Sequence, residues 1–197
     1  MPRLECVIFD LDNTLVDSDL DFDQIKREIG TDMTILEYRA KADPAEQQRV
    51  DRILAEHEAR AAETCTYCTG AWELLEFLKK HDVRTALLTR NSRRTIERVS
   101  ERLGMRFDAT LSREESEPKP SPMPIRHLCE TLDVPPARTL MVGDFLYDMQ
   151  AAERAGAMTL LVHSQHRHKF DYDADFEVET LHDAIPVVEN LLSDERG

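Results

Sequence analysis

Two aspartates separated by one residue follow directly after a short apolar run near the start of the chain. The run is Cys6–Phe9, and Asp10 and Asp12 come after it. Such a run predicts a strand buried on both faces of a parallel sheet, and open α/β sheets bind ligands beyond the carboxyl ends of their strands. Two like charges this close raise a pKa unless a cation lies beside them, and carboxylate oxygens suit Mg²⁺. The pair therefore predicts a magnesium site, although Asp and Asn are also common in plain turns.

A hydroxyl and an ammonium group stand at comparable places farther along the chain. Thr89 ends the apolar run Arg84–Leu88. It is spare for a ligand because Asn91 or Ser92 can cap the helix that follows. Lys119 lies between two prolines, which stiffen the backbone and suit the fixed placement of a positive charge. The plainer interpretation of Lys119 is a solvated loop lysine.

A third apolar run also ends in carboxylates. Thr139–Val142 is followed by Gly143 and Asp144, and Asp148 stands four residues after Asp144. At the start of a helix, residues i and i+4 share a face, so the two carboxylates could act together. Asp148 could equally be an acidic residue of the first turn that the helix dipole stabilises.

The segments between these residues predict a doubly wound α/β fold. Runs typical of buried strands alternate with helical patterns, which favours a parallel sheet with helices on both faces. The stretch from Asp17 to Thr69 interrupts the alternation. It contains one glycine, one proline and apolar residues at helical spacing, and it offers no candidate strand. We therefore expect an all-helical insert directly after the first strand.

Composition narrows the class of protein. The 197 residues carry 25 Lys and Arg against 39 Asp and Glu, for a formal net charge of −14. This charge argues against binding to nucleic acids or anionic membranes. No apolar run approaches the roughly 20 residues of a membrane span. The start of the chain does not resemble a signal peptide, and the four cysteines are expected as reduced thiols, so the sequence predicts a cytoplasmic protein.

Taken in order, these segments resemble the four motifs of the haloacid dehalogenase superfamily. The matching residues are Asp10-Leu11-Asp12-Asn13-Thr14, then Thr89, then Lys119, and finally Gly143-Asp144 with Asp148. The resemblance implies a Rossmann-like core formed by residues 1–16 and 70–197. It also implies a small helical cap at residues 17–69 and is strongest to phosphoglycolate-phosphatase-like members.

The resemblance also implies roles for the aspartates. Asp10 would be the nucleophile that forms an aspartyl-phosphate, and Asp12 the general acid and base. Mg²⁺ would be held by the carboxylates of Asp10 and Asp144 and by the backbone carbonyl of Asp12. Asp148 would support the metal shell or Lys119. Dehalogenases of the superfamily lack the second aspartate of the first motif, so Asp12 points to phosphate esters.

The remaining site residues are expected around the substrate. Thr89 and Lys119 would hold phosphate oxygens, and Asn91 is expected beside them, with Thr14 and Gly143 supporting the site. Arg90 stands where relatives usually have a small residue or Asn. It could clamp a second anionic group of the substrate, or be a surface arginine.

We therefore expect a Mg²⁺-dependent phosphatase acting on a small phosphorylated metabolite, as a monomer or homodimer. Two alternatives stay open: a phosphomutase of the same superfamily, and a catalytically idle binding module. Cys65 and Cys68 lack the further ligands that a zinc site needs. The histidines between His163 and His168 could bind a metal, but a solvated loop is the simpler interpretation.

Overall fold

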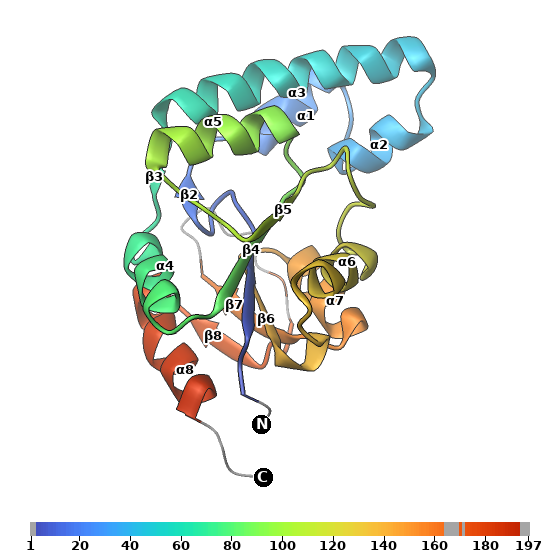
Figure 1. Ribbon diagram of the computed structural model, residues 1–197. Coiled ribbons are helices and arrows are strands. Elements are labelled where there is room, and N and C mark those ends of the chain that lie inside the picture. Colours follow the sequence, from blue (N-terminus) through green and yellow to red (C-terminus); the bar gives the residue numbers. More distant parts are fainter. Residues whose placement is uncertain (1–2, 164–169, 171, 194–197) are drawn as a thin grey trace.

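A six-stranded parallel sheet forms the centre of the molecule (Figure 1). The computed structural model describes residues 3–163, 170 and 172–193. The strands lie in the order β5-β4-β1-β6-β7-β8. Their bounds are β1 Cys6–Phe9, β4 Arg84–Leu88, β5 Ala109–Leu111, β6 Thr139–Gly143, β7 Met158–Val162 and β8 Phe176–Val178. The short strands β5 and β8 extend the predicted sheet at its two edges.

Helices cover both faces of this sheet, which confirms the predicted Rossmann-like fold (Figure 1). Residues of β1 alternate between two apolar clusters: Val7 and Phe9 belong to one, Cys6 and Ile8 to the other. The first cluster includes side chains of α4, α5 and α8, and the second those of α6 and α7. The helices are α4 Ala71–Lys80, α5 Arg93–Leu103, α6 Met123–Leu132, α7 Leu146–Ala155 and α8 Leu181–Ser193, with a short 3₁₀ turn at Pro136–Arg138.

The segment between β1 and α4 forms a helical insert with an apolar cluster of its own. Its helices are α1 Phe22–Ile29, α2 Ile35–Lys41 and α3 Pro44–Thr64. The cluster is formed by Ile25, Ile29, Ile35, Val50, Ile53 and Leu54. The long helix α3 runs beside α5 of the core (Figure 1).

The insert is not wholly helical, which corrects one expectation. Two antiparallel strands, β2 Val16–Asp17 and β3 Thr66–Tyr67, join its two ends to the core. Each strand has only two residues, which is too short for an apolar alternation to mark it in the sequence.

The register of the sheet brings the motif residues to one edge. Phe9 of β1 lies between Leu87 of β4 and Val142 of β6. Because these strands are parallel and adjacent, the residues after each strand emerge side by side at their carboxyl ends. Asp10, Thr89 and Asp144 are therefore neighbours in space although they are far apart in the sequence.

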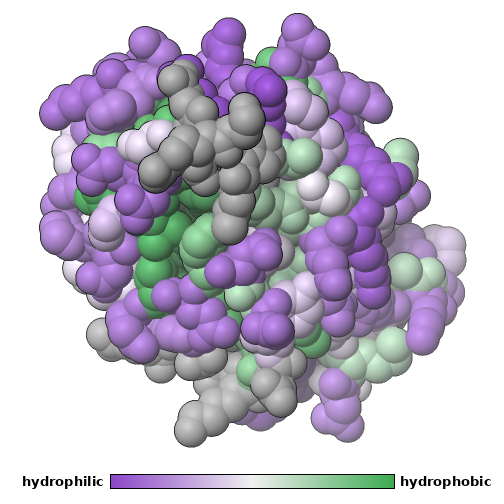
Figure 2. Space-filling view, turned by 90° about the horizontal axis from the view of Figure 1, so that it is seen from below, coloured by the Kyte–Doolittle hydropathy of each residue, from purple (hydrophilic) through white to green (hydrophobic). Residues whose placement is uncertain are grey.

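The opposite end of the molecule has a largely hydrophilic surface. Seen from below, hydrophilic residues surround a smaller group of hydrophobic ones (Figure 2). Within the described part of the chain, no helix combines the length and apolar character that crossing a bilayer requires.

Candidate active site

A buried lysine stands between two aspartates at the carboxyl end of the sheet. The Nζ atom of Lys119 lies 2.5 Å from Oδ1 of Asp10 and 2.6 Å from Oδ1 of Asp148. It also donates a hydrogen bond of 3.0 Å to the carbonyl oxygen of Leu88. Burial acts to lower the pKa of Lys119, but the two carboxylates outweigh it and the pKa is raised. Lys119 is therefore a fixed cation and not a solvated loop residue.

The two aspartates that contact this lysine belong to a cluster of three carboxylates. Oxygens of Asp10, Asp144 and Asp148 lie within 4.8 Å of one another. Asp148 serves the fold as well, because its Oδ2 accepts a hydrogen bond of 3.1 Å from the N–H of Phe145 at the start of α7. Burial raises the pKa of Asp148, and the charge of Lys119 opposes this rise.

Gly143 is required by the same packing. A Cβ atom on this residue would lie 2.5 Å from the Cβ, Cγ and Oδ2 atoms of Asp148. The end of β6 can therefore approach α7 closely only without a side chain, and this approach places Asp148 beside Lys119. The sequence pattern Gly143-Asp144 thus has a steric cause.

The carboxylate of Asp12 lies outside the three-aspartate cluster. Its Oδ1 accepts a 2.7 Å hydrogen bond from the hydroxyl of Ser18, and its Oδ2 accepts one of 2.7 Å from Nδ2 of Asn91. Burial, with the charge of Asp10 as the next cause, raises the pKa of Asp12 to about 7. This position is consistent with the expectation that Asp12 meets a metal only through its backbone carbonyl.

The residues that follow β4 make different hydrogen bonds. Thr89 is buried, and its Oγ1 accepts a 3.1 Å hydrogen bond from the N–H of Asn91. The helix that follows is capped by Ser92, whose hydroxyl accepts from the N–H of Thr95. Thr89 is therefore not needed as a cap. Asn91 binds Asp12, so its side chain is part of the aspartate's support.

The guanidinium of Arg90 stacks on an aromatic ring of α7. Its guanidinium carbon lies 5.2 Å from the centre of the Tyr147 ring. Burial lowers its pKa, against the nearby charge of Glu37 from the insert. Among the described residues, no hydrogen bond or ion pair engages this guanidinium, so its donors are available to an anion.

Some contacts of the site escaped the sequence interpretation. Ser18 stands six residues after Asp12, and a hydroxyl at the start of the insert was the only signal for it. Tyr147 lies inside the fourth motif, where an aromatic residue gives no hint of a stacked arginine. Thr14 is wholly buried, and its Oγ1 has no hydrogen-bond partner among the described residues.

The weaker candidates of the sequence stay apart from this site. Cys65 and Cys68 are free thiols, and no metal-binding group that includes them is found within the described part of the chain. His163 contacts Glu177 at 3.0 Å. His166 and His168 lie outside the described residues.

The acidic cluster fits a divalent cation. Its donors are all oxygen atoms, the ligand type that Mg²⁺ takes in proteins. The cluster brings three carboxylates together against the single ammonium group of Lys119, so further positive charge is favoured there. Asp10 and Asp144, with the backbone carbonyl of Asp12, are the residues that would hold the ion.

Comparison with known proteins identifies relatives over nearly the whole chain. Residues 4–156 match the family model described as haloacid dehalogenase-like hydrolase. A haloacid dehalogenase-like hydrolase domain-containing protein of Arabidopsis thaliana is 32% identical, and the match covers 96% of this chain and 84% of the relative. A phosphoglycolate phosphatase of Chromobacterium violaceum is 26% identical, and the match covers 96% of this chain and 99% of the relative.

A solved structure shows the same fold. CbbY of Rhodobacter sphaeroides, in complex with phosphate, matches with a TM-score of 0.72 and 22% identity, covering 92% of this chain and 96% of that chain. The predicted superfamily, and with it a hydrolase, is confirmed by the family model, and the expected likeness to phosphoglycolate phosphatases is confirmed by the Chromobacterium violaceum relative. The ordered motifs, the sheet that unites them and the family match agree: the chain belongs to the haloacid dehalogenase-like hydrolase family.

Proposed function

We propose that the protein is a Mg²⁺-dependent phosphatase that hydrolyses a small phosphate monoester through an aspartyl-phosphate on Asp10. The observation that carries this proposal is the placement of Asp10 against the ammonium group of Lys119 and in one cluster with the carboxylates of Asp144 and Asp148. Phosphoryl transfer depends mainly on positioning and on stabilising negative charge, and this arrangement offers both. When bound, Mg²⁺ would supply positive charge to the phosphate oxygens and to the attacking carboxylate.

The residues divide the reaction between them. An oxygen of Asp10 attacks phosphorus, the bond to the ester oxygen breaks, and Asp12 delivers a proton to that oxygen. Asp12 then takes a proton from water, which attacks the phosphorus and releases Asp10 and inorganic phosphate. The pKa of Asp12, raised to about 7, suits a group that gives and takes a proton near neutral pH.

Other side chains would bind the substrate. Thr89 and Lys119, which are both buried, are expected to hold phosphate oxygens, and Arg90 offers free donors to a second anionic group. We infer a cytoplasmic protein, monomeric or homodimeric, with no nucleic-acid partner. The phosphomutase alternative predicts return of the phosphoryl group to a sugar, whereas the idle-module alternative gives no reason for an Asp12 held by two hydrogen bonds.

Phosphate release from a panel of phosphorylated metabolites in Mg²⁺ tests the proposal. Asp10→Asn should reduce activity to background with every substrate, because no aspartyl-phosphate can form. Asp12→Asn should slow cleavage of an alkyl phosphate by about 10²–10⁴-fold, the usual effect of general acid catalysis. It should slow p-nitrophenyl phosphate less in the first step and give a burst of p-nitrophenol. Activity that survives in Asp10→Asn would contradict the assigned nucleophile.

A further inference from the structure

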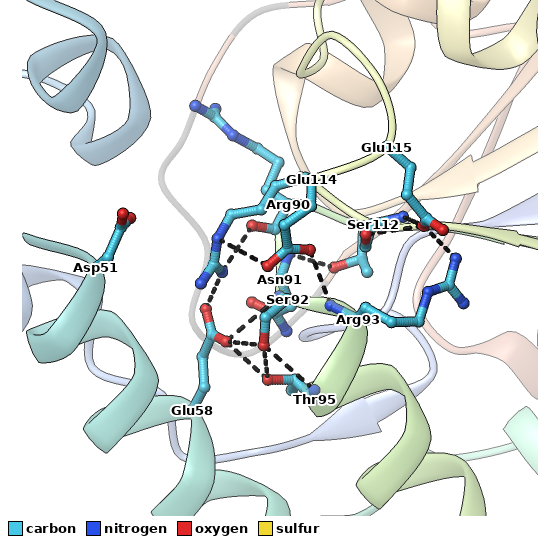
Figure 3. A network of polar contacts seen from close by, with 12 residues as sticks. Asp51, Glu58, Arg90, Asn91, Ser92, Arg93, Thr95, Ser112, Glu114 and Glu115 are labelled. Atoms are coloured by element: carbon cyan, nitrogen blue, oxygen red, sulfur yellow. Dashed lines mark hydrogen bonds and ion pairs between the residues drawn. The ribbon is translucent and has the colours of Figure 1, made fainter. Parts of the chain in front are cut away.

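A buried carboxylate of the insert reaches into the core beside the active site. Glu58 lies on α3 and is 1% exposed. Its Oε2 accepts hydrogen bonds of 2.7 Å from the hydroxyls of Ser92 and Thr95, and one of 3.3 Å from the N–H of Ser92 (Figure 3). Glu58 therefore binds the first turn of α5, where backbone N–H groups and the helix dipole favour an anion.

Arg113 completes this contact from the other side. It forms an ion pair with Oε1 of Glu58, and the two side chains are 11% and 2% exposed. The same Nη1 atom donates to the carbonyl oxygen of Arg90 at 3.3 Å, and the N–H of Arg113 donates to that of Asn91 at 3.0 Å. The segment from Arg90 to Ser92 is thus held between the insert and the loop after β5.

This segment also supports the proton donor. The amide of Asn91 donates its 2.7 Å hydrogen bond to Asp12 and is itself buried. A continuous set of contacts therefore runs from Glu58 to Ser92 and Arg113, along one residue of backbone to Asn91, and on to Asp12. The insert approaches the reacting groups through this set as well as through Ser18.

We propose that Glu58 is a positioning residue, which holds the Arg90–Ser92 segment so that Asn91 fixes the carboxylate of Asp12. This inference rests on the proposed function, because it assigns Asp12 the leaving-group proton. Displacing a catalytic group by about 1 Å can cost about 10²-fold in rate. The isosteric Glu58→Gln variant should cause such a loss, because its NH2 group must replace one of the two acceptor oxygens and then faces either Arg113 or the N–H of Ser92 donor to donor.

The leaving group separates positioning from a general loss of structure. The value of kcat/KM reports the steps up to release of the alcohol. For an alkyl phosphate it should fall by about 10²-fold in Glu58→Gln, whereas for p-nitrophenyl phosphate, which leaves without a proton, it should fall by less than about threefold. Equal losses on both substrates would overturn the proposal. In an Asn91→Ala background, Glu58→Gln should reduce kcat/KM for the alkyl phosphate little further. If the losses of the two substitutions instead multiply, as they do for independent residues, the proposal would also be overturned.

A second ion pair of the insert provides the matched control. Arg39 and Asp51 are joined by two hydrogen bonds of 2.5 and 2.7 Å within the insert itself. Asp51→Asn should therefore leave both kcat/KM values within about twofold of the original protein, as for other sites with no shared partners. If Glu58→Gln does not fold, the Glu58→Gln/Arg113→Gln double variant removes the unpaired charge and should show the same selective loss. Retention of full activity on the alkyl phosphate in that variant would overturn the proposal.

Hydrogen exchange gives a readout that does not need turnover. Amides of the segment from Arg90 to Thr95 should exchange faster in Glu58→Gln, and not in Asp51→Asn. Unchanged exchange would overturn the positioning role even in an active enzyme. If the original protein hydrolyses neither substrate, the proposed function is contradicted, whereas faster exchange in Glu58→Gln would still support the contact set.

Discussion

Replacing Lys119 should make the stability of the protein depend on Mg²⁺. Lys119→Met removes the buried ammonium that lies 2.5 Å from Asp10 and 2.6 Å from Asp148. The three carboxylates of the cluster then repel one another. Among the described side chains, no other cation forms an ion pair with Asp10 or Asp148. At pH 8 this repulsion should destabilise the metal-free protein.

The magnitude follows from the burial of the group. The side chain of Lys119 is 4% exposed, so solvent screens the pair little. Removing one partner of a buried ion pair typically costs about 3–5 kcal/mol. In a domain of this size each kcal/mol lowers Tm by about 2–4 °C, so we expect a decrease of about 6–20 °C in a chelator.

Thermal unfolding in EDTA and in millimolar Mg²⁺ is the assay. Mg²⁺ should raise Tm more in Lys119→Met than in the original protein, because the ion supplies the charge that is missing. Lys79→Met is the control: Lys79 is 80% exposed and 3.9 Å from Glu76, a pair expected to contribute at most about 1 kcal/mol. The reasoning is refuted if Lys119→Met melts within about 2 °C of the original protein in EDTA. It is also refuted if Mg²⁺ raises Tm equally in Lys119→Met and in the original protein.

Three further outcomes are expected. Gly143→Ala should lower kcat/KM by about 10²-fold, because the new Cβ would displace Asp148 from its place beside Lys119; unchanged kinetics would show that the contact relaxes harmlessly. Arg90→Ala should reduce kcat/KM for a substrate with a second anionic group more than tenfold beyond its effect on p-nitrophenyl phosphate, since charge-assisted hydrogen bonds contribute about 1.5–3 kcal/mol. Equal losses would make Arg90 a general electrostatic residue. Burial, with nearby carboxylates, raises the pKa of Cys68 to about 12, so its thiol is protonated at pH 8 and iodoacetamide should alkylate it far more slowly in the native than in the unfolded protein.

The parts of the fold that the sequence predicted are those with strong local patterns. β1, β4 and β6 coincide with the three apolar runs of the sequence, except that β6 extends by one residue to Gly143. The edge strands β5 and β8 have three residues each and partly exposed side chains, so they carry no such run. Their pairing is determined by the neighbouring strand rather than by their own composition.

The candidate site divides in the same way. Asp10 and Asp144 converge because the parallel strands β1 and β6 end together, and this could be inferred from the order of the motifs. Lys119 joins them from the loop between β5 and α6. The support of Asp12 could not, because Ser18 and Asn91 act through side-chain directions that only the folded chain defines. Asn91 was expected at the substrate, which stays a prediction, and the structure shows that its amide donates a hydrogen bond to Asp12.

The helical insert illustrates why contacts between distant segments resist prediction. Its apolar stripe predicted helices that pack together, and the cluster of Ile25, Val50 and Leu54 agrees with this. Nothing in that stripe distinguishes Glu58, so the sequence predicts a solvent-exposed carboxylate like the many others of this acidic protein. Its burial requires four donors from α5 and the loop after β5, and these become neighbours only when α3 lies along α5. A carboxylate is retained at such a buried position only where donors satisfy it. Two of these donors belong to Ser92 and another to Arg113, which also holds the carbonyl oxygen of Arg90, so a shift of the insert is expected to move the segment that supports Asp12.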